Sequence, residues 1–145
     1  MFLTGLLKPK TVAYAHCDLP CGVYDPEQAR IEAESCYKAI EKYNASSDEH
    51  FRARAILIKE ERAELAKHHI EVLWSDYFKP EHVQKYPEIT ELCWKAAKQC
   101  STVKQSLDAS EARTLIDMID RIADVWTKAG GPQATRMPKP VAARA

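Results

Sequence analysis

Residues 108–131 read DASEARTLIDMIDRIADVWTKAGG, and this stretch decides the fold class. Its apolar side chains recur with the period of one face of an α-helix, at Leu115, Ile119, Ile122 and Val125. The first residues, Asp108 to Glu111, have the composition of a capping box, in which side chains bind free backbone N–H groups. The two glycines at the end are a helix stop signal. The stretch therefore predicts an amphipathic helix that buries one face.

Three further stretches have the same period. The first follows Asp25-Pro26, where proline suits a first helical turn, and carries Ala29, Ala33, Cys36, Ile40 and Tyr43. The second is expected from near Asp48 to about Tyr77, with a core face of Phe51, Ala55, Ile58, Arg62, Leu65, His69 and Val72. The third carries Ile89, Leu92, Ala96, Cys100, Val103 and Leu107. Together they predict an all-α protein, an antiparallel four-helix bundle.

The second helix raises two points. Arg62 and His69 fall on its expected core face, where a polar group loses hydration unless it finds a partner. Lys79-Pro80 is expected to end the segment, because proline cannot continue a helix, and a loop is expected from there to Pro87.

Composition excludes several classes of protein. The 145 residues include 21 basic and 21 acidic side chains, so net charge gives nucleic-acid binding no support. No apolar run reaches the roughly 18 residues of a membrane span. Five cysteines, irregularly spaced and odd in number, do not make a disulfide scaffold. We expect a cytoplasmic protein whose thiols are reduced or bind metal, with neither nucleic acid nor membrane as a partner.

The two ends differ from the middle. Residues 1–15 contain two lysines and no acid, and they end Ala13-Tyr14-Ala15, which resembles a signal-peptidase site. The lysines follow the apolar stretch instead of preceding it, so we interpret residues 1–15 as a leader or propeptide removed on maturation, with an export signal as the less favoured alternative. Residues 16–129 form the expected domain. Residues 130–145 have prolines and no apolar period, which predicts a disordered tail.

The segment with the most specific chemistry is residues 16–24, HCDLPCGVY, which we call the hook. Cys17 and Cys21 have three residues between them, and Pro20 beside the second favours a tight turn that brings both sulfurs together. Thiolates are soft, strong electron donors, and His16 adds an imidazole. These residue types favour a metal or redox site.

A chain that began at His16 would offer a further donor. Its α-amine and the Cys17 amide nitrogen would close one chelate ring, and that nitrogen with the Cys17 thiolate would close another. The Cys21 thiolate would complete a planar N2S2 set, and the imidazole could reach an axial position. Square-planar nitrogen and sulfur ligands suit Ni(II), and an axial nitrogen suits Ni(III).

Two simpler interpretations remain open on residue types alone. The cysteine pair could be half of a zinc site, but no second Cys/His pair of suitable spacing follows. It could be a redox disulfide, but the Cys-x-x-Cys spacing and a βαβ context are missing.

The hook resembles the metal-binding segment of the nickel-containing superoxide dismutases, whose pattern is His-Cys-x-x-Pro-Cys-x-x-Tyr at the mature N-terminus. The similarity continues through residues 62–69, RAELAKHH, and 72–80, VLWSDYFKP. It is strong over residues 16–88 and general in the last two helices.

The resemblance implies an enzyme that converts superoxide to oxygen and hydrogen peroxide by Ni(II)/Ni(III) cycling, as an antioxidant defence. It implies a four-helix subunit in a homohexamer, one nickel ion per subunit, and a protease that matures the chain. The metal ligands it implies are the His16 amine and imidazole, the Cys17 amide nitrogen and thiolate, and the Cys21 thiolate.

The resemblance also implies roles around the metal. Glu32 and Arg62 position the His16 ring. The approach to nickel is lined by Asp18, Pro20, Tyr24 and Tyr77. Lys67 and Lys79 draw the superoxide anion inward, which fits electrostatic steering.

The chain departs from the family pattern in its proline-bearing tail and in Cys36, Cys93 and Cys100, which we expect to be small core residues. Two other functions compete with this interpretation. A metallochaperone would hold nickel or copper without turnover. A di-iron bundle protein needs Glu-x-x-His motifs on two helices, and the sequence has none.

Overall fold

The structure is a computed structural model, and it describes residues 24–131. Within this range there are helices and no strands. The elements are α1 (Glu27–Ala45), α2 (Glu49–Val72), the π-helical turn η1 (Leu73–Tyr77), α3 (Pro80–Lys85), α4 (Glu88–Gln105) and α5 (Ala109–Lys128). The all-α prediction is confirmed. None of the helices in the described range is long and apolar enough to span a membrane.

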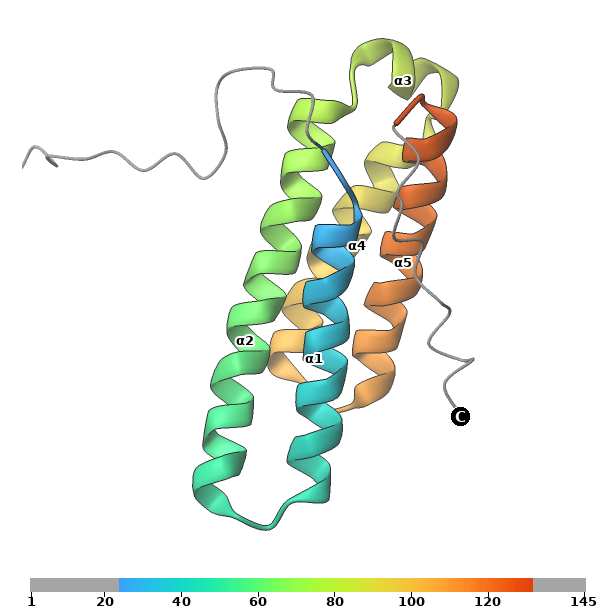
Figure 1. Ribbon diagram of the computed structural model, residues 1–145. Coiled ribbons are helices and arrows are strands. Elements are labelled where there is room, and N and C mark those ends of the chain that lie inside the picture. The colour runs from blue at the N-terminus through green and yellow to red at the C-terminus, as the bar shows by residue number, and fades with distance from the viewer. Residues whose placement is uncertain (1–23, 132–145) are drawn as a thin grey trace, which may run out of the picture.

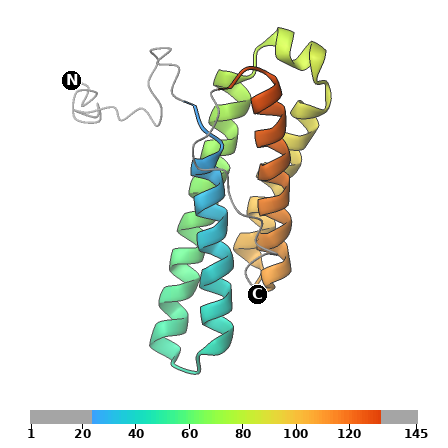
Figure 2. The ribbon, with the colours of Figure 1, turned by 45° about the vertical axis from the view of Figure 1, so that its right-hand side comes forward.

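The four long helices form an antiparallel bundle (Figure 1). α1 packs on α2 and α5, and α4 packs on the same two helices from the other side, so every neighbour runs in the opposite direction. The short α3 lies across one end, beside the C-terminal end of α5. At the other end, the α1–α2 hairpin extends beyond the turn between α4 and α5 (Figure 2).

The start of α5 is capped as expected, but only half of the predicted capping box forms. The Asp108 carboxylate accepts a hydrogen bond from the backbone N–H of Ser110 at 2.8 Å. Glu111 does not reach back; its carboxylate accepts from the Gln99 side chain at 2.7 Å. The backbone N–H of Asp108 donates instead to the Ser106 hydroxyl at 3.0 Å. A hydrogen bond between α4 and α5 thus replaces the expected local contact between the Glu111 carboxylate and the backbone N–H of Asp108.

Helix α5 ends just before the glycine pair, as the sequence predicts. The helix stops at Lys128, and Gly130 has a φ of 93°, a left-handed conformation that glycine adopts without strain. The N–H of Gly131 then donates to the Trp126 carbonyl at 2.9 Å. A side chain at Gly131 would meet the Trp126 ring at 2.3 Å, so a residue without Cβ is needed there.

The expected core face of α2 was wrong by one residue over most of its length. The residues that it buries are Ala55, Lys59, Ala63, Ala66 and Ile70. Phe51 and Ile58 are exposed, and Arg62 and His69 lie beside the core. Small alanines let α2 approach its neighbours closely, and the large apolar residues that set the sequence pattern flank that contact.

Two buried cations were not predicted. The Lys59 ammonium donates to the backbone carbonyls of Lys104 at 2.6 Å and Ser106 at 2.8 Å, which caps the end of α4. Burial lowers the pKa of Lys59. Arg30 binds Asp120 at 2.6 Å and so ties α1 to α5. Each buried charge has the hydrogen-bond partners that its lost hydration requires.

Candidate metal centre

The hook itself lies outside the described residues, except for its last member, Tyr24. The predicted ligands His16, Cys17 and Cys21 are therefore not described, and neither are Asp18 and Pro20 of the expected approach. Tyr24 lies just before α1, and its ring centroid is 5.8 Å from that of Tyr77. The structure thus brings together the two tyrosines that the sequence assigned to the approach.

Tyr77 is the last residue of η1, where the α-helical pattern of α2 widens. The Phe78 N–H donates to the Leu73 carbonyl at 3.1 Å, a bond across five residues. Such π-turns occur often at functional sites, because the extra residue re-aims the side chains that follow. Burial raises the pKa of Tyr77 above its usual 10.0. Its phenol therefore stays protonated near neutral pH and can donate a hydrogen bond.

An aromatic cluster surrounds Tyr77. Beyond Tyr24, its ring contacts Phe78 edge-on at 5.1 Å, Trp126 at 5.9 Å and His82 in a stacked arrangement at 5.6 Å. These rings come from η1 and the residue that follows it, from α3 and α5, and from the segment before α1. The end of the bundle next to the hook is thus closed by aromatic packing.

Glu32 and Arg62, which the family resemblance assigns to positioning the His16 ring, form an ion pair with each other. Their carboxylate and guanidinium lie 3.3 Å apart, between α1 and α2, and Arg62 is also 3.3 Å from Glu61. The Glu32 side chain is 16% exposed and that of Arg62 is 35% exposed. Arg62 precedes Tyr77 by fifteen residues along α2 and η1, which corresponds to roughly 22 Å of rise between their backbone positions.

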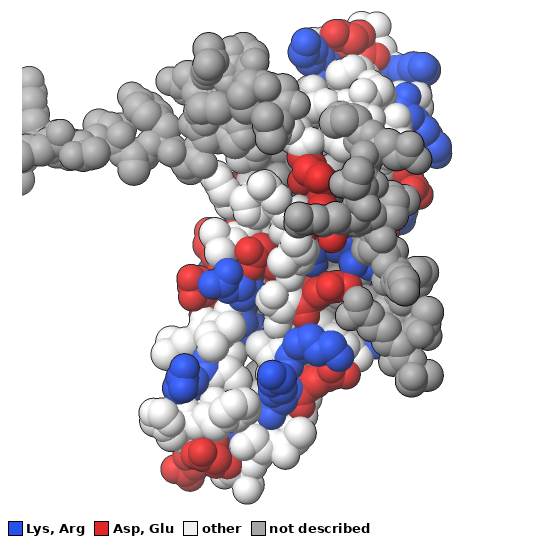
Figure 3. Space-filling view, in the orientation of Figure 1, with Lys and Arg blue, Asp and Glu red and all other residues white. Residues whose placement is uncertain are grey.

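The two lysines assigned to steering are accessible. Lys79 is exposed and Lys67 is partly exposed. Among residues 24–131, no ion pair involves either of them. Basic and acidic side chains are interspersed over the face seen in Figure 3. Any attraction of an anion on this face must therefore be local, since charges further apart than about 10 Å are screened at 0.1 M salt.

Comparison with known proteins decides the family. The profile of the nickel-containing superoxide dismutases matches residues 11–129, which include the hook and all the helices. The chain belongs to the nickel-containing superoxide dismutase family. The nickel superoxide dismutases of Streptomyces seoulensis and Streptomyces coelicolor are 53% and 52% identical to it over 124 residues, which are 86% of this chain and 95% of each relative.

Solved structures of nickel superoxide dismutases have the same fold. One with nickel ligation corresponding to the oxidized state aligns with a TM-score of 0.77 and 52% identity, over 81% of this chain and 100% of that chain. An apo structure aligns with a TM-score of 0.74 and 48% identity, over 76% of this chain and 99% of that chain.

The described thiols of this family member do not form a metal site. Cys36, Cys93 and Cys100 are free and fully buried, as expected of small core residues. Burial raises the pKa of each to about 12, so they remain thiols at neutral pH. In residues 24–131 no cluster of His, Cys, Asp and Glu could hold a metal ion. Cys17 and Cys21 are left as the candidate thiolate donors, a donor pair that fits nickel.

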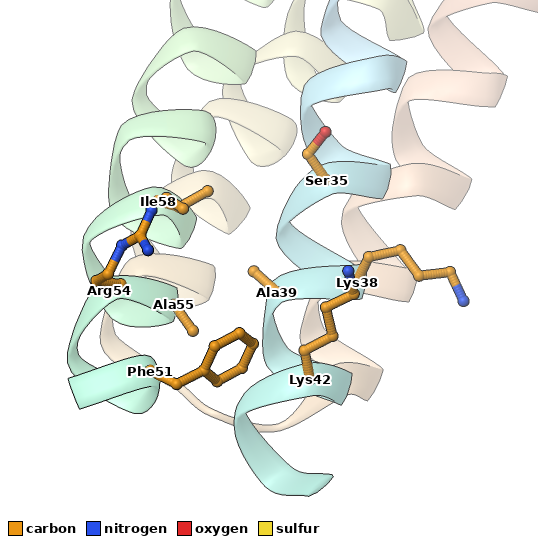
Figure 4. A pocket seen from close by; sticks show the side chains of 8 residues that line it. All are labelled: Ser35, Lys38, Ala39, Lys42, Phe51, Arg54, Ala55 and Ile58. Atoms are coloured by element: carbon orange, nitrogen blue, oxygen red, sulfur yellow. The ribbon is translucent and has the colours of Figure 1, made fainter. Parts of the chain in front are cut away.

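The bundle has a groove, but it lies far from these residues. It has a volume of about 340 Å³ and lies between α1 and α2 near their connecting turn, at the opposite end from Tyr24 and Tyr77 (Figures 1 and 4). Phe51 points from α2 towards α1 across it. No cysteine, histidine or carboxylate lines it, so it is not the metal centre.

Two features of the hook end were not predicted from the sequence. Helix α3 was expected to be loop, and no functional role was assigned to His82, which lies on α3. The one available signal was His82 three residues after Lys79 with proline between them, a spacing that suits the start of a short helix.

Proposed function

We propose that the chain disproportionates superoxide to oxygen and hydrogen peroxide at a nickel ion bound by the hook, after cleavage between Ala15 and His16. The observation that carries this is the family match over residues 11–129, combined with a hook in which every donor type for nickel is present. Nickel bound there would supply one-electron cycling between Ni(II) and Ni(III). The other steps rest on side chains of this chain.

The proposed ligands are the His16 amine and imidazole, the Cys17 amide nitrogen and thiolate, and the Cys21 thiolate. Glu32 and Arg62 orient the His16 ring by hydrogen bonding, since partners of this kind fix ligand orientation. Support comes from the ion pair at 3.3 Å, which leaves carboxylate oxygens to accept. Eight residues separate His16 from Tyr24 and span at most about 28 Å. The hook is thus long enough to bring His16 to this pair.

Tyr24 and Tyr77 line the approach, together with Asp18 and Pro20. The protonated Tyr77 phenol would order water and hinder larger anions from entering. Lys79, two residues after Tyr77, and Lys67 on α2 would attract superoxide locally, because the interspersed charges give no long-range field.

Three further proposals complete the account: assembly as a homohexamer, action of a maturation protease, and a cytoplasmic location. They rest on the family resemblance and on reduced thiols, which are typical of the cytoplasm. Mass and N-terminal residue of the protein purified from its host, with its size in solution, test them together.

The experiment for the activity compares protein beginning at His16 after loading with nickel and with zinc. Decay of a pulse of superoxide is followed at substoichiometric protein. The proposal predicts many turnovers with nickel and none with zinc, which has no accessible redox change. A nickel carrier would instead bind the metal without accelerating decay, and that result would reject the proposed function.

A further inference from the structure

Helix α3 is held in place without a buried core residue of its own. None of its six residues is buried, and six residues are too few to form a stable helix alone. Val83 and Tyr86 pack against the core from its surface, and two hydrogen bonds add to this contact. The hydroxyl of Tyr86, just after the helix, donates to the Lys128 carbonyl at the end of α5, at 2.9 Å. At its start, Nδ1 of His82 accepts from the Lys79 backbone N–H at 3.2 Å.

The second of these contacts also fixes an orientation. Because Nδ1 accepts this hydrogen bond, the His82 ring is held against the backbone of the chain reversal at Phe78 and Lys79. In this position the ring stacks on Tyr77, with centroids 5.6 Å apart and planes 20° apart. Phe78 closes the edge of the imidazole at 6.3 Å and 89°. The imidazole therefore forms one wall of the space in which the Tyr77 ring lies.

The other walls are Phe78, Tyr24 and Trp126, at 5.1 Å, 5.8 Å and 5.9 Å from Tyr77. Trp126 is fully buried and cannot move aside, whereas α3 is a surface helix. His82 is thus the wall whose loss would give the Tyr77 ring freedom to rotate. A tyrosine hydroxyl lies far from its backbone, so small rotations displace it widely, and a misplacement of about 1 Å can lower a rate by about a hundredfold.

We propose that His82 is a positioning residue for the substrate approach: its ring, by stacking, holds the Tyr77 hydroxyl in place relative to Tyr24. The inference rests on the proposed function, because it gives Tyr77 a part in that reaction. It attributes the effect to the ring's surface, and neither to its charge nor to a transferred proton.

Two substitutions separate these properties. His82→Phe keeps a ring that can stack and loses the acceptor and the charge. His82→Asn keeps an acceptor for the Lys79 N–H and loses the ring. We expect His82→Phe to retain kcat/KM within about twofold and His82→Asn to lose about tenfold, chiefly in kcat. His50→Asn, at an exposed histidine in the first turn of α2, is the matched control and should have no effect.

A double-mutant cycle tests whether His82 acts through Tyr77. In a Tyr77→Phe background there is no hydroxyl to position, so His82→Asn should cost almost nothing further. A general loss of structure would give additive effects instead. The proposal is overturned by additivity, by an unaltered His82→Asn enzyme, or by a His82→Phe enzyme as impaired as His82→Asn.

A measurement on metal-free protein tests the positioning role of His82 independently of the proposed dismutase activity. In metal-free protein with ¹³C-labelled tyrosine, His82→Asn should shift and broaden the Tyr77 ring signals, and His82→Phe should preserve a single narrow set. Unchanged Tyr77 signals in His82→Asn would overturn the positioning role. If nickel-loaded wild type showed no dismutation, the proposed function would fail, and these spectra would still decide whether His82 holds Tyr77.

Discussion

The two ends of the bundle are built differently. At the end with the α1–α2 and α4–α5 turns, helices begin at Asp48 and Asp108, whose carboxylates bind backbone N–H groups, and Lys59 caps α4. At the end next to the hook, α2 widens into η1, the chain runs extended through Phe78 and Lys79, and α3 has no buried residue. At this second end, aromatic side chains from several elements pack together, in addition to local caps such as the hydrogen bond from the Glu27 backbone N–H to the Asp25 carboxylate.

The difference separates stability from function. Regular caps satisfy the backbone within a few residues and place no side chain outside the bundle. Irregular backbone costs stability and persists where it places side chains that function requires. Substitutions at the end with the two interhelix turns, the capped end, should therefore alter the free energy of unfolding and leave activity intact. Substitutions at the end next to the hook, the hook end, should alter activity and leave the free energy of unfolding largely intact.

The largest effect is expected from the hook cysteines. Cys21→Ser, like Cys17→Ser, should abolish dismutation, because each removes a thiolate donor that favours the higher oxidation state of nickel. The midpoint of urea unfolding should not change. Cys93→Ala is the matched control at a buried thiol, and it should lower stability while kcat/KM per bound nickel is retained. Full activity of either serine variant would contradict the ligand assignment.

The next effect belongs to the capped end. Lys59→Met keeps the side-chain volume but leaves the carbonyls of Lys104 and Ser106 without their donor. We expect a loss of about 2 kcal/mol in the free energy of unfolding, measured in urea, with unchanged kcat/KM. Lys95→Met, at an exposed helical lysine, should change stability by less than about 0.5 kcal/mol. Equal stability of both variants would show that the cap contributes nothing.

The buried thiols should make the protein sensitive to alkali. Burial raises the pKa of Cys93 from 9.0 to about 12. Between these values the unfolded chain has lost a proton that the folded chain keeps, so the thiol's contribution is present below pH 9 and lost as pH rises towards 12. Above pH 9, the unfolding free energy of the wild type should therefore fall more steeply with pH than that of Cys93→Ala, which lacks the thiol. The difference in slope should be about 1.4 kcal/mol per pH unit. Parallel declines in urea titrations at pH 9 and 10 would contradict this.

A smaller effect is expected at the start of α2. The Asp48 carboxylate accepts from the backbone N–H groups of His50 and Phe51 at 3.0 and 3.4 Å. Asp48→Ala should cost about 1 kcal/mol of unfolding free energy without changing kcat/KM. Asp117→Ala, at an exposed position inside α5, provides the control and should not destabilise the protein.

The smallest effect concerns steering. Lys79→Gln, at the hook end, should lower kcat/KM by roughly threefold at low salt and flatten its dependence on ionic strength. Lys42→Gln, at an exposed lysine of the other end, should do neither. If kcat/KM of the two variants depended on ionic strength in the same way, Lys79 would have no role in steering superoxide.

The sequence predicted those features that depend on local chemistry. The bundle, the burial of Leu115 and its helical partners, the Asp108 cap and the glycine stop follow from periodicity and short-range hydrogen bonds. Arg62 was expected to need a partner on the core face of its helix; it lies beside the core and pairs with Glu32. Glu32 was assigned to the same site only by the family resemblance, because local sequence rules do not predict contacts between residues on different helices.

The features that were missed depend on packing between helices. The core face of α2 is set by how closely its alanines approach α1 and α4, and hydrophobicity alone favours the larger Ile58. Lys59 looks like any surface lysine until α4 places its carbonyls nearby. His82 acquires its role only when the chain reverses after Tyr77.

The central claim is that nickel binding requires the α-amine of His16. In the uncut chain this nitrogen belongs to a peptide bond, so its lone pair is delocalised and donates poorly. As an α-amine it has a pKa near 8, low enough for nickel to displace the proton. Cutting one residue early would leave Ala15 attached and move the amine out of the chelate.

The most direct measurement compares three nickel-treated proteins: the full-length chain, a chain beginning at Ala15, and a chain beginning at His16. Superoxide decay and the electron paramagnetic resonance of Ni(III) are recorded for each. We predict activity and a Ni(III) signal only for the chain that begins at His16. Comparable activity from the full-length chain would contradict the amine-ligand site.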